Sequence, residues 1–199
     1  MKKTNTGFRI FRSILMPIFK LYYNPKIENA EVVPTDGPII VCGHHKHLYD
    51  QCLPIAATKR TINYMAKKEY FDNKKVAWFF KTAGCIPVDR SKKDESAVKS
   101  ALDVLNNGGA IGLFPEGTRN KTNLFLQPFK FGAVSMAQKT GAYLVPFGIT
   151  GDYKFRSKNL TVRFGKPFKV PKNMDLAKAN EKLFNTVEKL MKKNLKDVK

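Results

Sequence analysis

The sequence predicts an α/β protein in which a mixed β-sheet is flanked by helices and preceded by an amphipathic N-terminal helix. Three observations predict it. Short apolar runs alternate with amphipathic stretches along residues 27–199, glycines follow the predicted helices, and residues 8–23 have the apolar periodicity of a helix. No Gly/Ser-rich linker, low-complexity tract or fixed-period repeat divides the chain, so we expect one compact domain after the N-terminal segment.

The first predicted element is a helix over residues 8–23. One stripe of this helix is apolar, with steps of three and four residues, and consists of Phe8, Phe11, Leu15, Ile18 and Tyr22. Ile10, Ile14 and Leu21 widen this apolar face to about half the circumference, at ~100° per residue. The opposite side carries Arg9, Arg12 and Lys20. Pro17 is expected to kink the helix or split it in two. This pattern has two interpretations that fit about equally well. The helix lies in a membrane headgroup layer, or it is a terminal helix docked on the protein's own core.

Short apolar runs predict the strands that follow. They lie at residues 39–42, 61–65, 85–88, 110–114, 143–149 and 160–164. Amphipathic stretches between and after them predict helices at residues 76–82, 95–105, 131–140 and 176–195. Three of these helices are followed within three residues by Gly84, by the pair Gly108 and Gly109, and by Gly141, where a residue with positive φ commonly ends a helix.

The charge of the chain predicts an anionic partner. The formal net charge is +20, from 36 Lys and Arg against 16 Asp and Glu, and residues 1–26 hold six basic residues and no acidic one. Nucleic acid, anionic lipid and an acidic substrate or carrier all fit this excess. The three cysteines form no CxxC pair, which favours a reducing compartment. No uncharged apolar run is long enough to span a bilayer and no signal peptide is recognisable, so we expect a cytoplasmic protein.

All three histidines lie in one segment, His44, His45 and His47, directly after the first strand of the predicted domain. Strand ends are where α/β sheets place their sites. His45 and Asp50 form the useful pair, because a neutral imidazole is a base near pH 7 and a carboxylate on its other nitrogen stabilises the imidazolium. The two side chains meet only if the loop is tight and the next helix starts between them.

Other interpretations of this segment remain open. The histidines fit a solvated surface, and together with Asp50 they offer metal ligands, although HExxH spacing and a nearby cysteine partner are absent. A nucleophilic triad would need a serine or cysteine on an elbow, and no GxSxG occurs. The sequence therefore favours a metal-free base over a covalent nucleophile.

Two further segments carry an arginine near a strand end. Residues 114–119 read FPEGTR, and residues 84–90 read GCIPVDR. The planar guanidinium fork of Arg119 and of Arg90 matches a phosphate group. Together they suggest a phosphate-bearing substrate, although a structural salt bridge explains either segment alone.

The order of these motifs resembles the four blocks of the glycerolipid acyltransferase family. The blocks are His45-x4-Asp50, residues 84–90, the FPEGTR turn and the segment 144–149. Within the family, the chain resembles bacterial 1-acylglycerol-3-phosphate acyltransferases, over about residues 30–165. The resemblance implies His45 as the general base and Asp50 as its orienting partner.

The resemblance also implies a substrate site. Its residues are Lys67, Arg90, Glu116, Gly117, Thr118 and Arg119, which would hold the glycerol phosphate of the acceptor. The strand at 144–149 would shape the acyl pocket. Two positions depart from the family's N-H-x-S-x-x-D pattern, because His44 replaces its asparagine and His47 its serine.

The implied reaction transfers a fatty acyl group from a thioester, acyl-CoA or acyl carrier protein, to the sn-2 hydroxyl of 1-acylglycerol 3-phosphate, giving phosphatidic acid. It needs no cofactor and no metal. Glycerol 3-phosphate or another lysophospholipid is the alternative acceptor. We expect residues 1–26 to associate with an anionic membrane at the cytoplasmic face, as a peripheral protein, and residues 27–199 to form the catalytic domain.

Two functions of other classes also fit part of the sequence. A basic nucleic-acid-binding module would explain the charge but not the clustered histidines or the FPEGTR turn, and the aromatic residues show no RNA-binding pattern. A catalytically silent membrane-surface protein on the same fold would not need the pair His45 and Asp50. We therefore expect an enzyme that does not bind nucleic acid.

Overall fold

The computed structural model describes residues 6–91 and 94–197, without the side chains of residues 6–8 and 11. In these residues seven strands form one sheet in the order β1-β7-β6-β2-β5-β3-β4. Their bounds are β1 Lys26–Glu28, β2 Ile39–Gly43, β3 Ile62–Lys67, β4 Ile86–Val88, β5 Ala110–Leu113, β6 Tyr143–Thr150 and β7 Thr161–Phe164. Neighbouring strands run parallel, except that β6 and β7 are antiparallel. The predicted mixed α/β sheet is confirmed.

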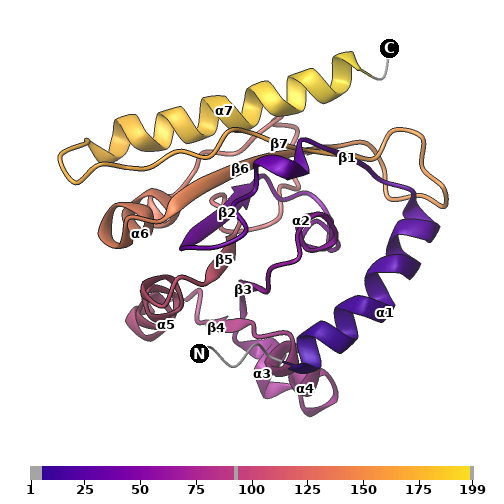
Figure 1. Ribbon diagram of the computed structural model, residues 1–199, viewed down its shortest axis with the longest axis horizontal. Helices are drawn as coiled ribbons and strands as arrows, with labels where there is room; N and C mark the ends of the chain where they lie inside the picture. The colour runs from indigo at the N-terminus through magenta and orange to yellow at the C-terminus, as the bar shows by residue number, and fades with distance from the viewer. Residues whose placement is uncertain (1–5, 92–93, 198–199) are drawn as a thin grey trace.

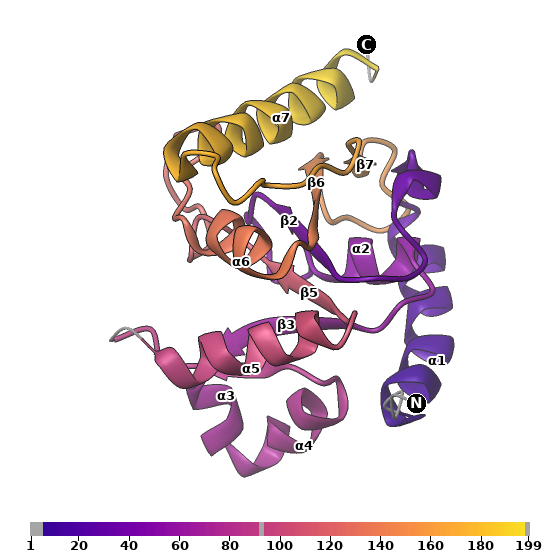
Figure 2. The same ribbon diagram turned by 60° about the vertical axis from the view of Figure 1, so that its left-hand side comes forward.

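Helices cover both faces of the sheet (Figures 1 and 2). Their bounds are α1 Thr6–Tyr23, the 3-10 turn η1 Ala30–Val32, α2 Cys52–Ala57, α3 Glu69–Asp72, α4 Lys74–Thr82, α5 Glu95–Asn106, α6 Gly132–Thr140 and α7 Leu176–Lys196. Helices α5, α6 and α7 pack on one face with Ile40 and Cys42, and α1 and α2 pack on the other with Ile39 and Val41. Because both faces are covered, β2 is buried at every position and reads as a continuous apolar run.

The predicted strands and helices are all present, with ends that differ by one or two residues. The predicted helix ends are also confirmed, because Gly84, Gly108 and Gly141 have φ of +68°, +65° and +69°. The elements that sequence analysis missed are β1, η1, α2 and α3. Each has six residues or fewer, which is too short for a period of 2 or 3.6 to be recognised.

Helix α1 continues through Pro17, so of the two predicted effects the proline does not split the helix. Met16 and Phe19, on either side of the proline, both pack against the core on the α2 face of the sheet. This packing holds the two halves of the helix on one surface, while the proline ring points to solvent. The part of the chain that the structure describes contains no helix long and apolar enough to cross a bilayer.

Helix α1 presents two apolar faces. Its core-facing side carries Met16, Phe19 and Tyr23. The exposed side carries Ile10, Ile14, Ile18, Leu21 and Tyr22, and the isoleucines are each more than half exposed. All five belong to the predicted apolar face, and among its described side chains Leu15 differs, because it is half-buried. The side chains of Phe8 and Phe11 lie outside the described residues.

Arg12 also differs from its predicted place on a solvent face opposite the apolar stripe. It is half-buried, and burial lowers the pKa of its guanidinium. The two interpretations of the segment therefore apply to different sides of one helix. One side is docked on the protein's own core, and the other remains apolar and uncovered.

Candidate active site

The histidine segment lies at the carboxyl end of β2, beside the FPEGTR turn at the end of the neighbouring strand β5. The chain leaves β2 toward α2 on one face of the sheet and leaves β5 toward α6 on the other. Adjacent strands whose connections diverge in this way open a crevice beyond their carboxyl ends. The last residue of β2 is a glycine, Gly43, because a Cβ at this position would lie 2.3 Å from the carbonyl oxygen of Phe147 on β6. The topology therefore brings two of the sequence motifs together.

His45 and Asp50 form a hydrogen-bonded pair, with 2.9 Å between His45 Nδ1 and Asp50 Oδ2. Sequence analysis made this contact conditional on a tight loop and on a helix that starts between the two residues, and the second condition is not needed, because α2 begins only at Cys52. A tight turn brings the pair together instead, and the N–H of Asp50 donates to the carbonyl oxygen of His47 at 3.3 Å. The turn closes the distance that a regular helix would leave between positions five apart.

The Asp50 carboxylate is buried and accepts hydrogen bonds on both oxygens. Oδ2 takes the backbone N–H groups of Lys46 and His47, at 2.7 and 2.6 Å, in addition to His45. Oδ1 takes the hydroxyl of Tyr153 at 2.7 Å. Burial alone would raise the pKa of Asp50, but the hydrogen bonds from His45, His47 and Tyr153 outweigh it, and the pKa is lowered. The carboxylate is therefore ionised when it meets the imidazole.

The His45 ring has one nitrogen bound and one available. Its side chain is 15% exposed and stacks on Phe114, with 4.0 Å between ring centroids and 11° between planes. Because an ionised carboxylate only accepts, its bond to Nδ1 assigns the imidazole proton to that atom. Nε2 then carries the lone pair. This arrangement can take a proton at Nε2 and stabilise the resulting imidazolium.

Glu116 joins the two loops of the site. Its Oε1 accepts the N–H of His45 at 2.7 Å, and its Oε2 accepts the N–H of Gln127 at 3.0 Å. Asn120 reinforces the contact, because its N–H donates to the carbonyl oxygen of His45 at 2.6 Å. Burial raises the pKa of Glu116, and the two backbone N–H groups partly offset this. The carboxylate thus points inward and supports the backbone on which His45 stands.

The last residues of the FPEGTR turn point outward. Gly117 has φ of +76°, and its N–H donates to the carbonyl oxygen of Phe114 at 2.9 Å, which closes the turn. Thr118 and Arg119 are exposed. A structural salt bridge was one explanation of the arginine, and the carboxylate of the same turn, Glu116, has both oxygens bonded to backbone N–H groups instead. The guanidinium of Arg119 is therefore presented to solvent.

Lys67 and Arg90 lie near each other at a second place, beyond the carboxyl ends of β3 and β4. Both line an open basin beyond the ends of β3 and β4, together with Lys68, Glu69, Asp72, Asp89 and Ser91. Lys67 Nζ lies 2.7 Å from the carboxylate of Glu69, in an exposed pair. The structure therefore brings Lys67 and Arg90 together, apart from the lining of the cavity beside Asp50.

The two histidines that depart from the family pattern occupy different surroundings. His44 is buried, and the N–H of Ile149 approaches its Nδ1 at 3.5 Å, so this nitrogen accepts. Burial lowers the pKa of His44 to about 4, which keeps the ring neutral near pH 7. His47 stacks on Tyr153, with 4.2 Å between centroids.

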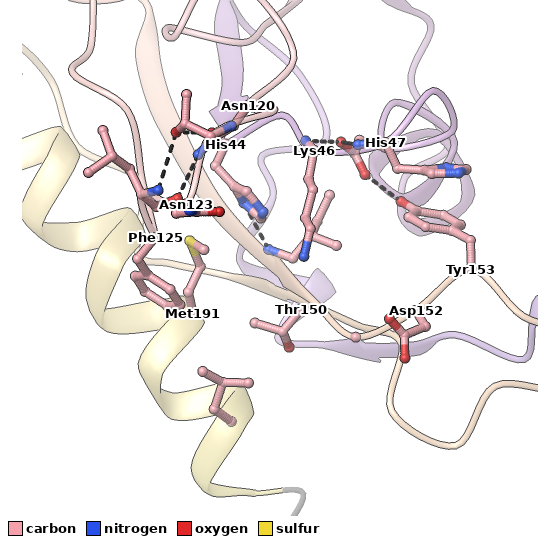
Figure 3. Close-up of a pocket in the computed structure, with 16 residues that line it drawn as sticks. His44, Lys46, His47, Asn120, Asn123, Phe125, Thr150, Asp152, Tyr153 and Met191 are labelled. Atoms are coloured by element: carbon pink, nitrogen blue, oxygen red, sulfur yellow. Dashed lines mark hydrogen bonds between the residues drawn. The ribbon is translucent and has the colours of Figure 1, made fainter.

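A cavity of about 490 Å³ opens beside the pair of His45 and Asp50 (Figure 3). It lies between the loops after β2 and β6, residues 120–125 and the end of α7. Its lining mixes polar residues such as Lys46 and Asp152 with the apolar Phe125 and Met191. Asp50 lies on its wall, so the cavity reaches the carboxylate side of the pair. In the described residues no group of three or more His, Cys, Asp or Glu side chains is placed to hold a metal ion.

Two contacts of the site were missed by sequence analysis. Phe114 was named only as part of the FPEGTR block, and it provides the surface on which His45 stacks. Tyr153 was not named, although it bonds Asp50 from a position 103 residues away. A single tyrosine in a loop carries no sequence signal. Only the fold could place it.

Comparisons with known proteins fit this geometry. A family model described as Acyltransferase matches residues 24–150. The 1-acyl-sn-glycerol-3-phosphate acyltransferase of Bacillus subtilis (strain 168) is 31% identical over 197 residues, which is 94% of this chain and 98% of the relative. That of Streptococcus pneumoniae is 26% identical, over 94% of this chain and 72% of the relative.

The fold is also similar to a solved structure. The 1-acyl-sn-glycerophosphate acyltransferase PlsC from Thermotoga maritima superposes with a TM-score of 0.75 over 95% of this chain and 78% of that one. The sequences are 22% identical, so this comparison shows that the fold is shared.

Proposed function

The chain belongs to the Acyltransferase family, and on that premise we propose that it transfers a fatty acyl group from a thioester to the sn-2 hydroxyl of 1-acylglycerol 3-phosphate. The product would be phosphatidic acid, a precursor in phospholipid synthesis. The observation that carries the proposal is the pair of His45 and Asp50, with Nδ1 held at 2.9 Å from the carboxylate and Nε2 left to act. The names of the relatives support the choice of acceptor.

The proposed step begins at the acceptor hydroxyl. As its oxygen attacks the thioester carbonyl carbon, its proton passes to His45 Nε2, and the Asp50 carboxylate stabilises the imidazolium through Nδ1–H. The tetrahedral intermediate then collapses, the carbon–sulfur bond breaks, and the thiolate takes the proton back from Nε2. His45 is neutral again after each turnover, and the acyl group ends as an ester.

Direct transfer without an acyl-cysteine fits the surroundings of the thiols. Burial raises the pKa of Cys52 to about 12 and that of Cys85 to about 11, and the pKa of the buried Cys42 is raised as well. A thiol is a weak nucleophile until it loses its proton. All three are therefore held in their unreactive form. The thioester donor would be acyl-CoA or an acyl carrier protein.

The outward guanidinium of Arg119 is the best placed group for the acceptor phosphate among the predicted residues of the FPEGTR turn. It is exposed near the pair, and the Glu116 carboxylate does not neutralise it. Arg90 and Lys67 add two cations in the basin by β3 and β4. Glu116 is a support for His45 in this proposal, because its two oxygens already accept backbone N–H groups.

We expect Arg119→Ala to raise KM for 1-acylglycerol 3-phosphate about 10-fold or more, because a charge-assisted bidentate contact to phosphate is lost. Arg119→Lys keeps the charge but not the planar guanidinium fork, so its KM for 1-acylglycerol 3-phosphate should lie between those of the wild type and of Arg119→Ala. KM for the acyl donor should change little in both. Lys139→Ala, which removes an exposed cation from α6, serves as the control. Equal changes for donor and acceptor would contradict a phosphate site.

The exposed apolar side of α1 supports a second part of the proposal, that residues 1–26 hold the enzyme on an anionic membrane while residues 27–199 form the catalytic domain. Ile10, Ile14 and Ile18 stand in a row on this side, each more than half exposed. The opposite side is packed on the core and cannot insert. The net charge of +20 would add attraction to anionic headgroups at the cytoplasmic face.

We expect the double substitution Ile14→Asp and Ile18→Asp to release the protein from anionic liposomes in a sedimentation assay. Turnover of detergent-dispersed substrate should stay close to that of the wild type, because both side chains point away from the core. The control is Ser13→Asp with Asn24→Asp, which adds the same charge at exposed polar positions. Equal release by both pairs would show that charge alone, without apolar insertion, holds the protein on the membrane.

A further inference from the structure

Tyr153 reaches the catalytic pair from the loop between β6 and β7. Its hydroxyl donates to Asp50 Oδ1 at 2.7 Å, on the carboxylate oxygen that His45 does not use. His45 and two backbone N–H groups all bond the other oxygen, Oδ2. The carboxylate is therefore held at both oxygens, and the Tyr153 bond restrains its rotation about the Cβ–Cγ axis from the side that the other donors leave free. Figure 3 shows Tyr153 beside His47 at the edge of the cavity.

The ring of Tyr153 is itself held in place. It stacks on His47 at 4.2 Å and 16°, and it meets Tyr23 of α1 edge-on, at 5.6 Å between centroids. The same loop is tied to the end of α1 a second time, because the N–H of Arg156 donates to the carbonyl oxygen of Tyr22 at 2.6 Å. The loop therefore cannot swing away from Asp50 without breaking contacts with α1.

We propose that Tyr153 is a positioning residue of this enzyme, whose hydroxyl holds the Asp50 carboxylate in the orientation that receives the His45 imidazolium. The inference rests on the proposed roles of His45 and Asp50. Tyr153 lies beyond residues 24–150, the segment that the family model matches. It would act through Asp50 without touching either substrate.

The chemistry of Tyr153 fits a fixed hydrogen-bond donor. Burial and the neighbouring Asp50 raise the pKa of its hydroxyl, so the phenol keeps its proton through the reaction. A bond to a charged acceptor is stronger than a neutral one. No proton leaves Tyr153, and its contribution is orientation. Losing it would slow the step in which the imidazolium forms and would leave substrate binding unchanged.

The variant Tyr153→Phe tests this inference, because it removes the hydroxyl and keeps the ring between His47 and Tyr23. We expect kcat to fall about 10-fold with KM unchanged for acceptor and donor, in detergent-dispersed substrate. Tyr143→Phe, which removes an exposed hydroxyl at the start of β6, should keep the wild-type kcat. A wild-type kcat in Tyr153→Phe, or a rise in KM without loss of kcat, would overturn the inference.

A double-mutant cycle separates positioning from general support of the fold. If Tyr153 acts through Asp50, Tyr153→Phe should lower kcat less than twofold when Asp50 is already alanine, because the carboxylate it orients is gone. An equal loss in both backgrounds would assign Tyr153 a structural role and overturn the inference. Absence of acyl transfer by the wild-type protein would contradict the proposed function, whereas an active wild type with an equally active Tyr153→Phe would contradict the inference alone.

Discussion

His45→Ala is expected to lower kcat for acyl transfer by about 10²–10⁴-fold, because the attacking hydroxyl loses the base that removes its proton. The protein should stay folded, since the His45 side chain is partly exposed and lies on Phe114 at the sheet edge, outside the core clusters. Turnover of labelled 1-acylglycerol 3-phosphate measures the effect, and circular dichroism with a thermal midpoint checks the fold.

The partner variant Asp50→Asn should cost a similar factor. An amide does not provide the negative charge that stabilises the imidazolium, and its NH₂ group can force the histidine into the other tautomer. Asp103→Asn, on the exposed side of α5, is the matched control and should be fully active. A folded His45→Ala protein with near-normal turnover would refute the general-base role, whatever the result for Asp50.

Glu116→Ala is expected to lower the free energy of unfolding by about 2–5 kcal/mol and to reduce kcat/KM at the same time. The substitution leaves the partly buried N–H groups of His45 and Gln127 without their acceptors, and each buried unpaired group costs about 1–3 kcal/mol. The loop that carries His45 would lose its tie to the FPEGTR turn. Denaturant titration measures the stability, and the same samples give the kinetics.

The control for Glu116 is Glu181→Ala, an exposed carboxylate on α7, which should change neither quantity. The stability and kcat/KM of Glu116→Gln should lie between those of the wild type and of Glu116→Ala, because its single carbonyl oxygen replaces one of the two acceptors. A Glu116→Ala protein with unchanged stability and a selective rise in the acceptor KM would show that the carboxylate contacts the substrate, as the family resemblance implies.

Much of the fold follows from local patterns in the sequence. The apolar run at residues 39–42 predicts a buried strand, and β2 is buried on both faces. Gly84, Gly108 and Gly141 predict helix ends, and each has positive φ. These predictions hold because burial on a regular element and the steric freedom of glycine are local properties. The short elements β1, η1, α2 and α3 leave no such period and were missed.

The candidate site could likewise be predicted only in part from the sequence. The sequence alone determined that His45 and Asp50 follow a strand, that FPEGTR follows another, and that both belong to one family pattern. It did not determine that β2 and β5 are neighbours, because strand order depends on how crossovers pack on the two faces of the sheet. The separation of Glu116, turned inward to His45, from Arg119, turned outward, is likewise a result of the tertiary structure.

The N-terminal helix and Tyr153 show the limit most clearly. The sequence determined that residues 8–23 form an amphipathic helix, but the side of α1 that is buried was decided by contact of Phe19 and Tyr23 with the core. The bond from Tyr153 to Asp50 spans 103 residues and has no periodic or motif signal. A hydrophobic period records how much of an element is buried, whereas the partner that buries it depends on the packing of distant segments, which only the tertiary structure decides.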